Sequence, residues 1–382
     1  MKHKRLFYLD LIRGIAALAV FLGHLRAVLF PDYGSLVNPS IVQKIFYFCT
    51  GLGHQGVVVF FVLSGFFVGG SVVTSHKRFC LKKYLVSRLV RLWIVLLPAL
   101  LLTALTDFGI RNLKPEILTG TYYQEWNSGP HPESIASNSI PIFLGNMVFL
   151  QTILCPVFGT NSPLWSLANE FWYYMAFPAI TIVLGWSIEV DKVLPRFLAG
   201  GVLVLMWLFL PPGIQEGFFL WLLGVGVYLL VKKNPEKLRK SIGIMGMLVF
   251  FACLYYSKKA PFILEKNISA DWIVGIGFAF WLFGLCQMPG FQNHQWFRRV
   301  IEFISESSYT LYVIHFPLVI FFAGVLAPSC QKLEETKPLA LFFGIGGLII
   351  VISSLLWFFF ERNTDWVRQR IFQRLNRGGS VS

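Results

Sequence analysis

The chain has 382 residues, of which 55% are hydrophobic and 14% are charged, and its mean hydropathy is +0.64. Soluble globular domains carry about 25% charged residues, so this composition excludes an ordinary soluble protein. The net charge of +14 does not indicate a nucleic-acid-binding protein, because the basic residues lie between long apolar segments, where they act as a topology signal. We therefore expect no nucleic-acid partner.

The first segment of the chain is predicted to be a retained membrane helix. A basic start precedes an apolar stretch, as in a secretory signal, but Asp10 and Arg13 interrupt the apolar run and no clear cleavage site follows. Further apolar segments follow that suit a hydrocarbon core about 30 Å thick. The ten predicted spans are residues 7–29, 55–75, 89–106, 163–185, 197–211, 214–231, 241–257, 271–289, 306–327 and 339–360.

The Lys and Arg residues predict which side of the membrane each loop faces. Of the 33 such residues, most lie in the two terminal segments and in the loops at 76–91, 186–196, 232–240 and 289–305. By the positive-inside rule this side is cytoplasmic. The sequence thus predicts an all-α, polytopic transmembrane helical bundle of about ten spanning helices, multi-pass in the plasma (inner) membrane, with both termini cytoplasmic.

Residues 107–162 form the largest predicted outer segment. Within it, 140–154 is apolar but too short to span, so we expect it to dip into the membrane or to lie at its interface. We expect a single integral-membrane domain over 1–382 with no appended soluble domain, and any chemistry must then occur within the bundle. The six cysteines show no CxxC pair and no histidine at metal-ligand spacing, so neither a disulfide framework nor a metal site is expected.

The first predicted helix carries three candidate functional residues, Asp10, Arg13 and His24. At 100° per residue, Arg13 and His24 fall about 20° apart around the helix axis, and Asp10 lies one turn before Arg13. Ionisable groups within a span normally face a cavity or a partner. His24 suits a general base and Arg13 suits an anion or a carboxylate. The structural alternative is an Asp10–Arg13 ion pair with His24 hydrogen-bonded in the bundle.

Arg88 and Arg91 lie one helical turn apart in a basic segment on the predicted cytoplasmic side. Two guanidinium groups suit the phosphates of a cytosolic ligand. Basic segments beside a membrane also bind anionic lipid head groups, and the segment alone leaves both interpretations open.

The segment from Ser162 to Tyr174 opens the fourth predicted span from the outside. Ser166, Glu170 and Tyr174 recur every four residues and share one face. Glu170 and His24 fall at similar predicted depths, which makes them a candidate catalytic pair. The structural alternative is a protonated Glu170 bonded to a tyrosine.

Two further segments carry weaker signals. Ser64 stands with Gly65 in an apolar run, where helix packing is favoured over chemistry. Tyr312 and His315 lie one turn apart near mid-membrane, where they would line a substrate path or join two helices by a hydrogen bond.

These segments together resemble the membrane-bound acyltransferase-3 family. The matching parts, in chain order, are Leu9 to Ala17 with Arg13 followed by His24 after ten intervening residues, Gly56 to Phe66 with Ser64, Arg88 to Arg91, Ser162 to Glu170 with Trp165 and Ser166, and Ser308 to His315 with Tyr309 and Tyr312. Their order and their spread over the chain make the resemblance specific. The number of predicted helices also looks like that family's membrane domain.

The resemblance implies acyl transfer, commonly of acetyl, from a cytosolic coenzyme A thioester to a hydroxyl of a glycan, a glycolipid or a similar acceptor. It implies catalytic roles for Arg13 and His24 and a donor site at Arg88 and Arg91, and we add Glu170 as the residue that orients His24. The predicted substrate path holds Asp10, Ser64, Trp165, Ser166, Tyr309, Tyr312 and His315. The expected partners are acyl-CoA, the acceptor and anionic lipids at the cytoplasmic face. The main rival is a multi-pass secondary transporter, which predicts inverted repeats that the sequence does not show.

Overall fold

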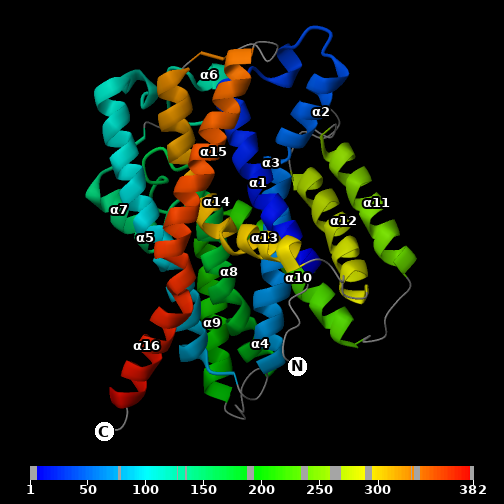
Figure 1. Ribbon diagram of the computed structural model, residues 1–382. Helices are drawn as coiled ribbons and strands as arrows, with labels where there is room; N and C mark the ends of the chain where they lie inside the picture. Colours follow the sequence, from blue (N-terminus) through cyan, green and yellow to red (C-terminus); the bar gives the residue numbers. More distant parts are fainter. Residues whose placement is uncertain are drawn as a thin grey trace. The chain divides into compact units, whose positions relative to one another are not determined.

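A computed structural model (Figure 1) describes residues 7–75, 79–126, 128–133, 136–186, 193–233, 240–258, 268–288, 295–327, 329–330 and 336–378. Over these residues the chain forms helices joined by turns, with an isolated β-bridge between Gln151 and Cys155 and no β-strand. The all-α prediction is therefore confirmed. Parts of the basic loops on which the topology prediction rests, including 187–192, 234–239 and 289–294, lie outside the described residues, as does the basic start at 1–6.

The described chain folds into two compact units, each built from three separate segments. Unit 1 comprises Met1–Ala16, His54–Leu81 and Asn169–Ser305, and unit 2 comprises Ala17–Gly53, Lys82–Ala168 and Glu306–Ser382. Helices α1 (Phe7–Leu29) and α8 (Leu164–Val183) each contribute more than one residue to both units, because the unit boundaries follow Ala16 and Ala168.

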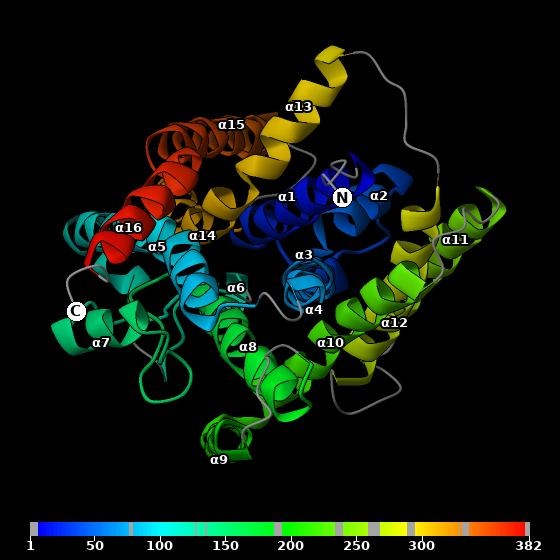
Figure 2. The ribbon, with the colours of Figure 1, turned by 90° about the horizontal axis from the view of Figure 1, so that it is seen from below.

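Unit 1 contains the first part of α1 and the later part of α8. Its other helices are α3 (Gly53–Ser64), the π-helical turn η2 (Gly65–Gly69), α4 (Gly70–Ser75), α9 (Val193–Phe209), α10 (Pro212–Lys233), α11 (Lys240–Ser257), α12 (Ile268–Gln287) and α13 (Gln295–Glu306). Helix α12 packs between α10 and α11, and the three lie in a row when seen from below (Figure 2).

Glycines decide how closely two elements of unit 1 approach. A Cβ atom on Gly65 of η2 would overlap the carbonyl oxygen of Trp221, and one on Gly224 would overlap the carbonyl oxygen of Val62. Because neither glycine has a side chain, η2 packs directly against the backbone of α10, as small residues allow in membrane helix bundles. The helix-packing interpretation of Gly65 therefore holds.

Unit 2 contains the rest of α1 and the start of α8. Its other elements are η1 (Tyr33–Ser35), α2 (Ile41–Thr50), α5 (Leu81–Leu113), η4 (Pro115–Ile117), α6 (Tyr123–Trp126), α7 (Ile140–Met147), α14 (Ser308–Val319), the π-helical turn η6 (Ile320–Gly324), α15 (Thr336–Phe359), η7 (Glu361–Asn363) and α16 (Thr364–Gly378). Helix α14 packs against α15. The stretch 140–154 folds as the short helix α7 followed by turns, in agreement with the prediction that it does not span.

Asp107 of α5 is a buried carboxylate that forms hydrogen bonds with the long segment between α5 and α8 in unit 2. Asp107 accepts hydrogen bonds from the amide of Thr160 at 3.0 Å, from the Thr160 hydroxyl at 2.6 Å and from the side-chain amide of Asn138 at 2.8 Å. Gly159 has a φ of +55°, and a Cβ atom there would overlap the Asp107 carboxylate. The loop therefore needs glycine at this position both for its backbone conformation and for space.

Six helical stretches among the described residues are long and apolar enough to cross a membrane: Phe7–Leu29, Ile41–Ser75, Leu81–Leu113, Pro212–Lys233, Ala270–Gln287 and Thr336–Leu375. Helices α13 and α14 with η6, which are bent at a short break, make a seventh if they count as one span. The predicted spans at 197–211 and 241–257 correspond to shorter apolar helices, and 163–185 corresponds to α8. A multi-pass membrane protein is thus supported, whereas the count of ten and the cytoplasmic termini stay predictions.

Candidate active site

His24 of α1 and His315 of α14 are hydrogen-bonded to each other in unit 2. Nδ1 of His24 lies 2.8 Å from Nε2 of His315, and the planes of the two rings differ by 16°. His315 is fully buried, and the ring of Phe316 lies 4.6 Å from that of His24 between centroids. The structure thus joins two histidines that belong to different sequence motifs.

The other contacts of His315 decide which ring nitrogens carry protons when the pair is neutral. Its Nδ1 lies 2.8 Å from the carbonyl oxygen of Tyr312 and 3.1 Å from that of Leu311. Because a carbonyl oxygen only accepts, this Nδ1 carries a hydrogen and Nε2 is an acceptor. His24 must then donate from Nδ1, which leaves its Nε2 with a free lone pair. This is the tautomer that a general base or a nucleophile at Nε2 requires.

Ser166 and Tyr312 form a second polar contact in unit 2. The Ser166 hydroxyl lies 3.1 Å from the carbonyl oxygen of Pro163 and 2.5 Å from the hydroxyl of Tyr312, and either hydroxyl can donate in the contact between them. The rings of Tyr312 and His315 lie 6.0 Å apart. The predicted path residues Ser166, Tyr312 and His315 are thus brought together. A path role for Trp165, which precedes Ser166 on α8, stays a prediction.

Arg13 and Asp10 form the ion pair named as the structural alternative, at 3.6 Å in unit 1. Both also contact Ser305 of α13. Arg13 donates to its hydroxyl from Nε at 3.0 Å and from Nη2 at 2.6 Å, and the hydroxyl donates to Asp10 at 2.9 Å. The predictions for Asp10 and Arg13 did not include Ser305, because a lone serine at a helix end gives no signal in the sequence.

Glu170 is hydrogen-bonded within unit 1 to residues that the sequence analysis partly anticipated. Its carboxylate accepts from the hydroxyl of Ser64 at 2.7 Å and from that of Tyr174 at 2.5 Å. The indole of Trp221 donates to Ser64 at 3.1 Å. The tyrosine partner agrees with the structural alternative for Glu170. The predicted pairing of Glu170 with His24 joins residues of different units and stays a prediction.

Arg91 of α5 makes an ion pair in unit 2, with its Nη1 2.7 Å from Oε1 of Glu361. Its guanidinium also lies over the ring of Tyr309, 5.1 Å from the centroid. Arg88, one turn earlier, lies over the ring of Tyr84 at 5.8 Å. Glu361 is missing from the predicted site because it follows the last predicted span directly. An acid at the very end of an apolar run is the signal that would have found it.

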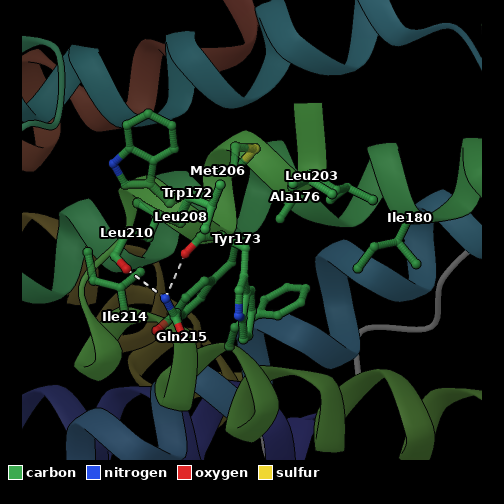
Figure 3. A pocket seen from close by; sticks show the side chains of 13 residues that line it. Trp172, Tyr173, Ala176, Ile180, Leu203, Met206, Leu208, Leu210, Ile214 and Gln215 are labelled. Atoms are coloured by element: carbon green, nitrogen blue, oxygen red, sulfur yellow. Dashed lines mark hydrogen bonds between the residues drawn. The ribbon is translucent and has the colours of Figure 1, made fainter. Parts of the chain in front are cut away.

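The structure also holds an apolar pocket in unit 1, between α8, α9 and α10 (Figure 3). Its volume is about 360 Å³, and the described residues that line it include no carboxylate, amine or imidazole. The amide nitrogen of Gln215 is bonded to the carbonyl oxygens of Trp207 and Leu210, as the dashed lines in Figure 3 show. Such a lining suits hydrocarbon and does not suit the phosphates of a coenzyme.

Comparison with known proteins identifies the family. A family model described as an acyltransferase domain, that of the acyltransferase-3 family, matches residues 6–358, which is nearly the whole chain. Searches of curated proteins and of solved structures found no match. The matched range contains every residue of the predicted site. With its several helices suited to crossing a membrane, the chain belongs to the membrane acyltransferase-3 family.

Proposed function

We propose that this acyltransferase moves an acyl group, commonly acetyl, from cytosolic acyl-CoA to a hydroxyl of a glycan, a lipid-linked sugar or a similar acceptor at the plasma (inner) membrane. Family membership supports acyl transfer. The observation that carries the mechanism is the hydrogen bond between His24 and His315, because it leaves Nε2 of His24 with a lone pair.

His24 would act on the acceptor hydroxyl through Nε2. It removes the hydroxyl proton while the oxygen attacks the thioester carbonyl, so that a C–O bond forms and the C–S bond breaks. Coenzyme A leaves as a thiolate and takes the proton back from His24. A covalent route, in which Nε2 first carries the acyl group, uses the same lone pair.

His315 supports either route by accepting a hydrogen bond from Nδ1 of His24. When His24 becomes positively charged, this bond becomes charge-assisted and therefore stronger. The Nδ1–H group of His315 in turn points to a backbone carbonyl oxygen, which disperses part of the charge. This arrangement favours the charged histidine of the transition state over the neutral one of the ground state.

The basic segment that carries Arg88 and Arg91 would receive the donor. The nucleotide end of coenzyme A is polyanionic, and its slender thioester arm can enter between helices. Unit 2 contains both this segment and His24, which supports a donor path within one unit. The predicted site residues in unit 2 are His24, Arg88, Arg91, Trp165, Ser166, Tyr309, Tyr312 and His315.

Arg13, on the same helix as His24, would orient the acceptor or the donor, and Glu170 would orient His24 or stabilise its charged form. The other Lys and Arg residues of the cytoplasmic face would contact anionic lipids.

The test is the ester content of surface glycans in the native host. Mild alkali releases ester-bound acyl groups, which are quantified in strains with the gene, without it, and with His24→Ala expressed at the same level. We expect the ester to disappear on deletion and to return only with the unaltered gene. An unchanged ester content in the deletion strain would exclude a surface-glycan acceptor, and uptake assays would then test the transporter.

A further inference from the structure

Arg91 forms an ion pair with a buried acid, Glu361. The Glu361 side chain is 1% exposed, and its Oε1 lies 2.7 Å from Nη1 of Arg91. A carboxylate buried to this degree needs a positive partner or several hydrogen bonds. Arg91, which is 34% exposed, therefore supplies the charge that makes an ionised Glu361 tolerable at this position.

The second carboxylate oxygen of Glu361 accepts hydrogen bonds from the start of α14. Oε2 accepts from the backbone amide of Thr310 at 3.0 Å and from the Thr310 hydroxyl at 2.5 Å. The amides of a first helical turn lack partners within the helix, so this carboxylate satisfies one of them and also interacts favourably with the helix dipole. Tyr309 adds a further attachment, because its hydroxyl donates to the carbonyl oxygen of Leu92 on α5 at 3.0 Å.

Helix α14 also carries the histidine that fixes the tautomer of His24. His315 lies five residues after Thr310, which corresponds to about 7.5 Å along a helix axis. A rotation or shift at the start of α14 would therefore move His315 relative to His24. Arg91, Glu361 and Thr310 thus form a continuous polar chain from α5 to the helix that carries His315.

The same chain makes Arg91 a poor ligand for a phosphate. An anion that approached its guanidinium would lie near the Glu361 carboxylate, which water screens little because it is buried. The negative charges of the bound anion and of the Glu361 carboxylate would then repel each other. Arg88 lies one turn away over an aromatic ring, and it provides the matched comparison.

We propose that Arg91 is a positioning residue, which sets α14 and His315 through Glu361, and that within the basic segment the donor phosphates are bound by Arg88. This inference rests on the proposed function for its catalytic consequence, and it separates two arginines that the family resemblance treats alike.

The experiment compares Arg88→Ala, Arg91→Ala, Glu361→Gln and the double variant Arg91→Ala/Glu361→Gln, purified in neutral detergent. Three quantities are measured: the thermal midpoint, the binding of coenzyme A, and the rate of transfer as a function of acetyl-CoA concentration. Arg91→Ala should lower the thermal midpoint and reduce the maximal rate at least tenfold, with coenzyme A affinity within twofold of the unaltered protein. Arg88→Ala should weaken coenzyme A binding at least tenfold with little change in the midpoint.

The double variant gives the sharpest result. Glutamine still offers an oxygen to Thr310 but carries no charge, so Arg91→Ala/Glu361→Gln should recover the thermal midpoint and most of the rate lost in Arg91→Ala. If Arg91 binds phosphate instead, its removal weakens coenzyme A binding at least tenfold and Glu361→Gln does not restore it; that result overturns the proposal.

Two further outcomes are also decisive. If Arg91→Ala cannot be purified, Arg91→Lys takes its place: a lysine paired with Glu361 should keep donor affinity, whereas a tenfold loss of affinity would contradict the positioning role. If the unaltered protein neither binds coenzyme A nor transfers an acyl group, the proposed function fails. The thermal midpoints then decide the Arg91–Glu361 pairing separately, and a double variant no more stable than Arg91→Ala would refute it.

Discussion

Replacement of His315 by leucine should slow acyl transfer by about ten- to hundredfold. Leucine cannot accept the hydrogen bond that Nδ1 of His24 donates over 2.8 Å. A hydrogen bond to a charged group contributes about 1.5–3 kcal/mol, and about 1.4 kcal/mol corresponds to a factor of ten in rate. The loss should fall on the maximal rate rather than on donor affinity, because the bond strengthens as His24 becomes charged.

His315→Gln is the matched variant for this test. Its side-chain oxygen can occupy the region of Nε2 and accept from His24, so we expect it to retain more activity than His315→Leu. The assay follows transfer of labelled acetyl to the glycan fraction in membranes at saturating acetyl-CoA, with equal amounts of each variant. If His315→Leu is within threefold of the unaltered protein, or if both variants lose the same activity, the assigned tautomer does not control the reaction.

Three further predictions test other parts of the structure. His24→Ala should abolish transfer without loss of membrane insertion. Near-normal transfer in the inserted variant would show that His24 has only a structural role in the bundle. Reporter fusions after Lys240 and at the C-terminus should report the cytoplasm and one near Pro130 the outside; a C-terminus outside would mean an odd number of spans. Gly159→Ala should lower the thermal midpoint in detergent, because alanine disfavours a φ of +55° and its Cβ atom overlaps the Asp107 carboxylate, whereas an unchanged midpoint would show that the loop adapts.

The sequence predicted the membrane class and the main motifs because both are local properties. An apolar run such as 341–360 carries its own hydrocarbon affinity, whatever the rest of the chain does. Helix geometry alone places Arg13 and His24 on the same face of one helix. The number of spans was harder to predict, because segments such as 197–211 and 241–257 are near the length limit and their neighbours decide whether they cross.

The sequence also identified His24 and His315 as residues of interest, but only the tertiary structure joined them. They lie 291 positions apart, and no periodicity links them. The same holds for Arg91 and Glu361, which meet where the end of α15 reaches α5. A local pattern shows which side chains are costly to bury, because that cost depends on the side chain itself. Which partner offsets the cost depends on how distant helices pack, and that is decided by tertiary structure alone.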